Sequence, residues 1–197
     1  MHDTQGNVAM DAGARRITIT GAHAFHSATV EKGAGYPADF FIKGSQILLD
    51  RCTSQGDGSF YVATVNSEAV LNVALNCTFE GKGSIQPHMH WSTGLLIDSC
   101  HLPAGRIEFI NRHTAGSGHG WAIGWAVAWN CAAKVLEMQQ PPGAMNWCIG
   151  CTGDLKKSSF QNGSWLSSRG TPVVPGSLYL AHLRERLGES ALKNIGY

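Results

Sequence analysis

A short unit built around a cysteine recurs along the chain and constrains the fold more than any other feature. Each unit has an apolar run, a polar residue, a cysteine, and then two short extended stretches separated by Gly or Pro. The aligned cysteines, 23 to 31 residues apart, are Cys52, Cys77, Cys100 and Cys131. Ala22 occupies the equivalent position upstream and Cys151 the one in a shorter unit downstream. A unit of this length cannot bury a core alone, so the copies must stack.

Stacked copies predict a parallel β-solenoid, in which each strand pairs with its equivalent in the next unit. About five to six rungs, spaced about 4.8 Å apart, would form a stack roughly 25 Å long. A small thiol repeated at one corner suits a buried structural ladder. Only Cys148 and Cys151 have CxxC spacing, and the second pair that a zinc site needs is absent. A redox role for this pair is the alternative.

The composition agrees with a strand-rich globular domain. Charged residues make up 15% of the chain and glycines number 24, which disfavours a helical bundle. The net charge of +1 disfavours a basic nucleic-acid-binding protein. No apolar run is long enough to span a membrane, and the N-terminal residues lack a signal-peptide apolar region. We therefore expect neither nucleic acid nor membrane as a partner.

The pattern x-Cys-Thr-Phe-x-Gly in LNCTFEGKGSI, with its relatives in neighbouring units, resembles the right-handed parallel β-helix of the pectate-lyase-like superfamily. The resemblance covers roughly residues 15–155 and implies a carbohydrate-active, secreted or cell-surface protein. The resemblance also implies how each unit is divided among three sheets. The stretch before each cysteine lies in the second sheet, the short stretch after it in the third, and the next stretch in the first.

Two parts are expected. Residues 1–155 form an all-β, right-handed parallel β-helix, which reads as a few rungs of a longer one; self-association or a missing remainder of the chain would extend it. Residues 156–197 form a Ser/Gly/Pro-rich loop and a C-terminal α-helix that Ser177 can cap and Gly188 interrupts. WAIGWAVAWN alternates large and small residues, which favours a strand over a helix.

Histidines gather in the strands expected to form the first sheet. Alternate residues of a strand share a face, and neighbouring rungs place equivalents side by side. This alignment directs Phe60, Ile85 and Ile107 inward and Tyr61, Gln86 and Glu108 outward. The outward catalytic candidates are His88, His90, Arg112, His113, Glu108 and Glu137. The candidates for substrate binding are Trp91, His119, Trp121 and Gln139.

These residue types suit the cleavage of an acidic polysaccharide by β-elimination. Arg112 can neutralise a uronate carboxylate through its planar guanidinium, which makes the neighbouring proton more acidic. A neutral histidine is a suitable base near pH 7. We expect His88 or His90 to be the base, assisted by His113. The expected partner is therefore an acidic polysaccharide or oligosaccharide.

Three alternatives stay open. Glu108 and Glu137 lie in successive rungs, at a spacing close to the roughly 5 Å of retaining glycosidases. No cofactor is expected, but His88, His90 and His113 could hold a divalent metal. The protein could also be a non-catalytic β-helix module that binds glycan or protein. Asp50 and Asp98 align in the second sheet, where a structural ladder with Arg51 is expected.

Overall fold

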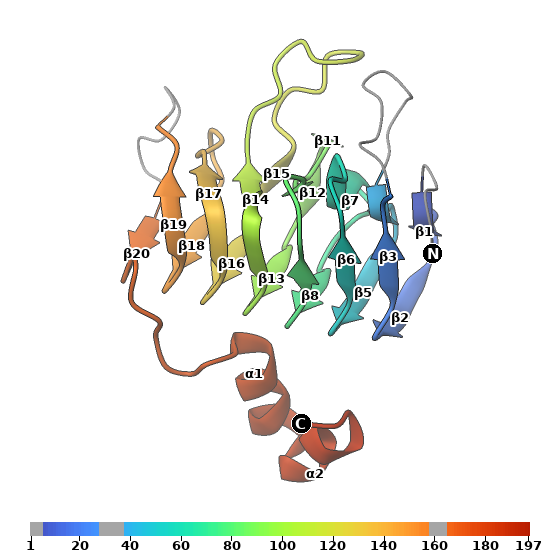
Figure 1. Cartoon of the computed structure of the whole chain (residues 1–197), viewed down its shortest axis with the longest axis vertical. Coiled ribbons are helices and arrows are strands. Elements are labelled where there is room, and N and C mark those ends of the chain that lie inside the picture. Colours follow the sequence, from blue (N-terminus) through green and yellow to red (C-terminus); the bar gives the residue numbers. More distant parts are fainter. Residues whose placement is uncertain (1–5, 28–37, 158–164) are drawn as a thin grey trace.

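The chain folds into stacked, parallel β-strands (Figure 1). The computed structural model describes residues 6–27, 38–157 and 165–197. In this part of the chain the strands form an eleven-stranded, a seven-stranded and a two-stranded sheet. Parallel pairing between successive repeats confirms the expected all-β, solenoid-like architecture.

The seven-stranded sheet, here called the second sheet, consists of the strands that precede the aligned corner residues. Its order is β2 (Arg15–Thr20), β5 (Ser45–Asp50), β8 (Val73–Leu75), β13 (Leu96–Asp98), β16 (Val127–Trp129), β18 (Trp147–Ile149) and β20 (Trp165–Ser167). β16 falls in the tryptophan-rich segment, which is strand as predicted. β20 pairs with β18, so the succession of strands continues past residue 155.

The eleven-stranded sheet joins the expected first and third sheets. The first-sheet strands are β1 (Gly6–Met10), β4 (Ala38–Ile42), β7 (Phe60–Asn66), β10 (Ser84–Ile85) and β11 (Met89–His90). The third-sheet strands are β3 (His23–Phe25), β6 (Thr53–Gln55) and β9 (Thr78–Phe79). The strands that run through both are β14 (His101–Phe109), β17 (Ala132–Met138) and β19 (Thr152–Leu155). The small sheet pairs β12 (Ser92–Thr93) with β15 (Ile123–Gly124).

The aligned cysteines line the corner between the second and third sheets. All are buried with free thiols. Each contacts the preceding repeat: the Cys100 thiol donates to the Ala74 carbonyl at 3.4 Å, and the Cys131 thiol to the Ile97 carbonyl at 3.3 Å. The residue before each cysteine adopts a left-handed backbone, for example Asn130 at φ 48°. The sharp turn therefore repeats in register along the stack.

Apolar side chains from successive repeats fill the interior, but the predicted orientations of Tyr61 and Phe60 are wrong. Tyr61 was expected to face outward, yet it is fully buried and its ring stacks on Phe79 at 5.1 Å. Its hydroxyl donates to the Gly56 carbonyl at 3.2 Å. The cause is a register shift: Ile85 pairs with Val62 instead of Phe60, because the ladder is irregular between β7 and β10.

The C-terminal segment returns along the stack, beneath the cysteine corner (Figure 1, red). It contains α1 (Leu178–Leu187) and α2 (Glu189–Asn194). As predicted, Ser177 caps α1, and Gly188 ends it. Asp98 accepts hydrogen bonds from the Ser177 hydroxyl and the Tyr179 amide, at 2.8 and 2.7 Å. Neither helix, nor any other in the described ranges, is long and apolar enough to cross a membrane.

Candidate functional site

Arg112 lies at the centre of a cluster of aromatic and imidazole rings. It follows β14. Residues 112–122, which start with Arg112, belong to the long loop at the top of Figure 1. Its Nη1 donates to the His88 carbonyl at 3.1 Å and also contacts His88 Nδ1. Its guanidinium carbon lies 5.8 Å from the centre of the Phe60 ring, which is edge-on to His88 at 5.4 Å. These contacts hold the guanidinium in one orientation.

His88 is a neutral acceptor for Arg112. Burial, together with the positive charge of Arg112, lowers the pKa of His88 to about 2. The His119 ring lies 4.6 Å from the His88 ring, and burial lowers the pKa of His119 as well. Because a neutral imidazole has one unprotonated nitrogen, the contact from Arg112 assigns that role to His88 Nδ1. His88 is therefore suited to positioning Arg112 and poorly suited to taking up a proton.

His90 has the opposite character. It lies at the end of β11, its side chain is exposed, and its Nδ1 is 3.1 Å from the His119 carbonyl oxygen. A carbonyl oxygen can only accept, so His90 Nδ1 must carry the proton. In the neutral imidazole the lone pair is then on Nε2. His90 thus presents a solvent-exposed base that is linked to the cluster through His119, whose ring lies beside His88.

The third predicted histidine does not join this cluster as a metal ligand. His113 is exposed and has a left-handed backbone, φ 48°, at the turn that closes on Gly120. Within residues 6–27, 38–157 and 165–197, no three His, Cys, Asp or Glu side chains are grouped to hold a metal ion. The alternative triad of His88, His90 and His113 is therefore not assembled in the described structure.

Two carboxylates lie on the neighbouring strands β14 and β17. Glu108 pairs directly with Glu137, as the alignment of the internal repeats predicted, and both side chains are buried. The Gln86 amide donates to Glu108, and Arg106 Nη1 lies 3.6 Å from it. Lys156 Nζ lies 2.7 Å from Glu137. Each carboxylate thus has its own cationic neighbour, which offsets the repulsion between the two.

The residues predicted to bind substrate all have contacts within the chain. Trp91 lies against Gly124, where an added Cβ would come within 2.5 Å of its ring. Gln139 is buried, accepts from the Asn111 amide at 2.6 Å and donates to Glu137 at 3.1 Å. His119 is buried beside His88. Trp121 is half-buried, and its backbone bridges to Asn111 at the base of the loop.

Phe60 was predicted to point into the core and was therefore not recognised as part of the site. The irregular ladder between β7 and β10 turns this ring toward His88 and Arg112. The cations Arg106 and Lys156 were likewise not recognised as partners of the two glutamates. An Arg two residues before Glu108 on the same strand was the available signal, since residues i and i+2 share a face.

The assembled groups can bind an anion and accept a proton beside it. No family model, curated protein or solved structure matches this chain. The chemistry of the site is therefore the guide to function. A fixed guanidinium, held by His88 and Phe60, suits a carboxylate in one orientation. An exposed imidazole with its lone pair on Nε2 suits the abstraction of a proton made acidic by that contact.

Proposed function

We propose that this protein is a right-handed parallel β-helix enzyme that cleaves a uronate-containing polysaccharide by β-elimination. The observation that carries the proposal is one cluster that holds Arg112, oriented by His88 and Phe60, and the exposed His90, whose ring contacts the backbone of His119 next to His88. Polysaccharides of this kind occur outside cells, so the proposal includes secretion or attachment at a cell surface. It requires no cofactor.

The reaction follows from the roles of the side chains. Arg112 binds the uronate carboxylate and stabilises the negative charge that develops on it. His90 Nε2 takes the proton from the adjacent ring carbon. The electron pair of that C–H bond forms a carbon–carbon double bond, and the glycosidic C–O bond breaks. The leaving oxygen takes a proton from solvent or from His113, which is exposed on the loop.

The test measures the ultraviolet absorbance of unsaturated uronate with polygalacturonate, alginate, hyaluronan and chondroitin. Arg112→Ala and His90→Gln should each lower the rate on the cleaved glycan by about 100-fold or more. His182→Gln, an exposed histidine on α1, is the matched control and should keep the wild-type rate. Absence of unsaturated product from any polymer, or equal rates in all three variants, would contradict the proposal.

A retaining glycoside hydrolase is the second candidate. It is favoured by the direct pairing of Glu108 with Glu137, because strands about 4.8 Å apart approximate the roughly 5 Å separation of retaining carboxylates. This enzyme would release reducing ends without absorbance, and both Glu108→Gln and Glu137→Gln would abolish the release. Glycan binding without any product would instead indicate a non-catalytic module, and activity lost only with a chelator would indicate a metal.

A further inference from the structure

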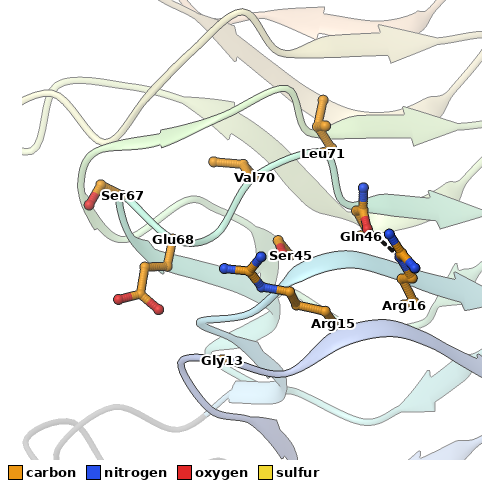
Figure 2. A pocket seen from close by; sticks show the side chains of 9 residues that line it. All are labelled: Gly13, Arg15, Arg16, Ser45, Gln46, Ser67, Glu68, Val70 and Leu71. Carbon is orange, nitrogen blue, oxygen red and sulfur yellow. Dashed lines mark hydrogen bonds between the residues drawn. The ribbon is translucent and has the colours of Figure 1, made fainter.

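A pocket that the proposed elimination chemistry does not use lies at the start of the seven-stranded sheet (Figure 2). Its volume is about 560 Å³. It is lined by Gly13, Arg15, Arg16, Ser45, Gln46, Ser67, Glu68, Val70 and Leu71. Figure 2 shows the Arg15 guanidinium directed toward the Glu68 side chain, and no ion pair joins the two in the described part of the chain. Both charged side chains are exposed and line the pocket.

The fold itself directs these side chains outward. Arg15 pairs with Ser45 in neighbouring strands, which places Arg16 beside Gln46. Arg16, Gln46 and Leu71 all have left-handed backbones, with φ of 57°, 57° and 55°. Arg16 Nε donates to Gln46 Oε1 at 3.3 Å. The same turn thus repeats in three successive copies and presents a cation, an amide and an apolar side chain along one edge.

The lining matches the chemistry of an acidic sugar. Arginine binds a carboxylate through two parallel hydrogen bonds. Glu68, Gln46 and the serine hydroxyls can accept from or donate to ring hydroxyls. Leu71 is 61% exposed, and with Val70 it offers an apolar surface for the C–H face of a sugar ring. A simple inorganic anion would use only the arginines.

This pocket and the Arg112 cluster meet at the end of β7. Asn66, the last residue of β7, pairs with His90. Ser67 and Glu68 follow directly and line the pocket. Successive repeats are about 4.8 Å apart, which is close to the length of one sugar unit. A glycan that lies along the stack can therefore contact both places with different units.

We propose that the Arg15–Arg16–Glu68 pocket is a second, non-catalytic site that binds a uronate unit of the glycan. The proposal rests on the proposed function for its choice of ligand. In this site Arg15 and Arg16 bind the carboxylate, and Glu68 binds ring hydroxyls. Binding here does not depend on Arg112.

The experiment is an NMR titration of the full chain with glucuronate, followed through backbone amides. Glucuronate should shift the amides of Gly13, Ser45 and Ser67 in the wild type. The double variant Arg15→Ala/Arg16→Ala should raise the Kd at these amides by about tenfold or more. The matched control Arg184→Ala/Arg186→Ala also removes two exposed arginines, from α1, and should leave the Kd unchanged. Arg15 and Arg16 are exposed, so circular dichroism should show both double variants folded.

Two further ligands test the chemistry. Glucose has the ring without the carboxylate, and inorganic sulfate has the charge without the ring. Both should bind at least about tenfold more weakly than glucuronate. Equal binding of sulfate, unshifted pocket amides, or an unchanged Kd in Arg15→Ala/Arg16→Ala would each overturn the second site.

The two proposals fail separately. Pocket amides that shift with glucuronate in both the wild type and Arg112→Ala support the second site, even if no polymer is cleaved. Cleavage of a uronate polymer without any shift at Gly13, Ser45 and Ser67 supports the lyase and overturns the second site.

Discussion

Glu108 and Glu137 are directly paired on the neighbouring parallel strands β14 and β17, and both side chains are buried. Two adjacent buried negative charges are unfavourable unless cations compensate them. Lys156 provides this for Glu137 at 2.7 Å, from the following repeat. A cation that follows β19 in the next repeat therefore stabilises the pair.

Replacing Lys156 should destabilise the fold because Glu137 would lose its nearest cation while remaining beside Glu108. The lysine side chain is 56% exposed, so we expect Lys156→Gln to cost only about 1–2 kcal/mol. Urea unfolding measures this cost. Lys134→Gln, an exposed position on β17, is the control and should change stability little. Adding Glu137→Gln to Lys156→Gln should recover part of the loss; no recovery would exclude the charge explanation.

Lowering the pH should destabilise the protein through His88. Its folded pKa is about 2, below the ordinary value of 6.5, so the unfolded state binds the proton more readily. The stability associated with neutral His88 is complete above about pH 6.5 and is lost as the pH falls toward about 2, by up to about 1.4 kcal/mol per pH unit.

Urea unfolding of the wild type and of His88→Gln at pH 7 and pH 5 measures the pH dependence of stability that His88 contributes. The stability of His88→Gln should fall less between the two values than that of the wild type. His182→Gln, at an exposed position, should retain the wild-type slope. Identical slopes for wild type and His88→Gln would show that His88 is not the group responsible.

Tyr197 anchors the end of the chain to the stack. Its hydroxyl donates to Asp50 at 2.6 Å and accepts from the Asn76 amide at 2.9 Å. Tyr197→Phe leaves Asp50 without this donor and should cost about 1–2 kcal/mol, concentrated in α1 and α2. Hydrogen exchange of the helical amides measures the effect. Tyr179→Phe removes a hydroxyl for which the described residues provide no hydrogen bond and should have a smaller effect.

Adding a methyl group at Gly124 should disturb the packing of Trp91. The new Cβ would come within 2.5 Å of the Trp91 ring and 2.8 Å of the Ala144 Cβ. We expect Gly124→Ala to cost about 1–3 kcal/mol in thermal or urea unfolding. Gly176→Ala is the control, since nothing lies within 4 Å of its Cβ position. Combining Gly124→Ala with Trp91→Leu should relieve the clash. A double variant as unstable as Gly124→Ala alone would show that contact with Trp91 is not the cause of the destabilisation.

The alignment of repeats predicted the parts of the site that depend on regular pairing. It placed Glu108 opposite Glu137 and brought His88, His90 and Arg112 to neighbouring repeats. It failed for Tyr61 and Phe60, because the irregular ladder between β7 and β10 exchanges their directions. Side-chain alternation has a period of two, so a shift of one residue reverses every orientation up to the next irregularity.

The sequence by itself determined the parallel stacking, the corner positions of the cysteines and the capped C-terminal helix, because each depends on residues that are close in the chain or repeat along it. Only the tertiary structure decided that Arg112 lies over Phe60 and against His88, and that Arg15 and Glu68 line one pocket. These contacts join side chains from separate repeats and loops. Their geometry depends on local register and burial, which no spacing in the sequence records.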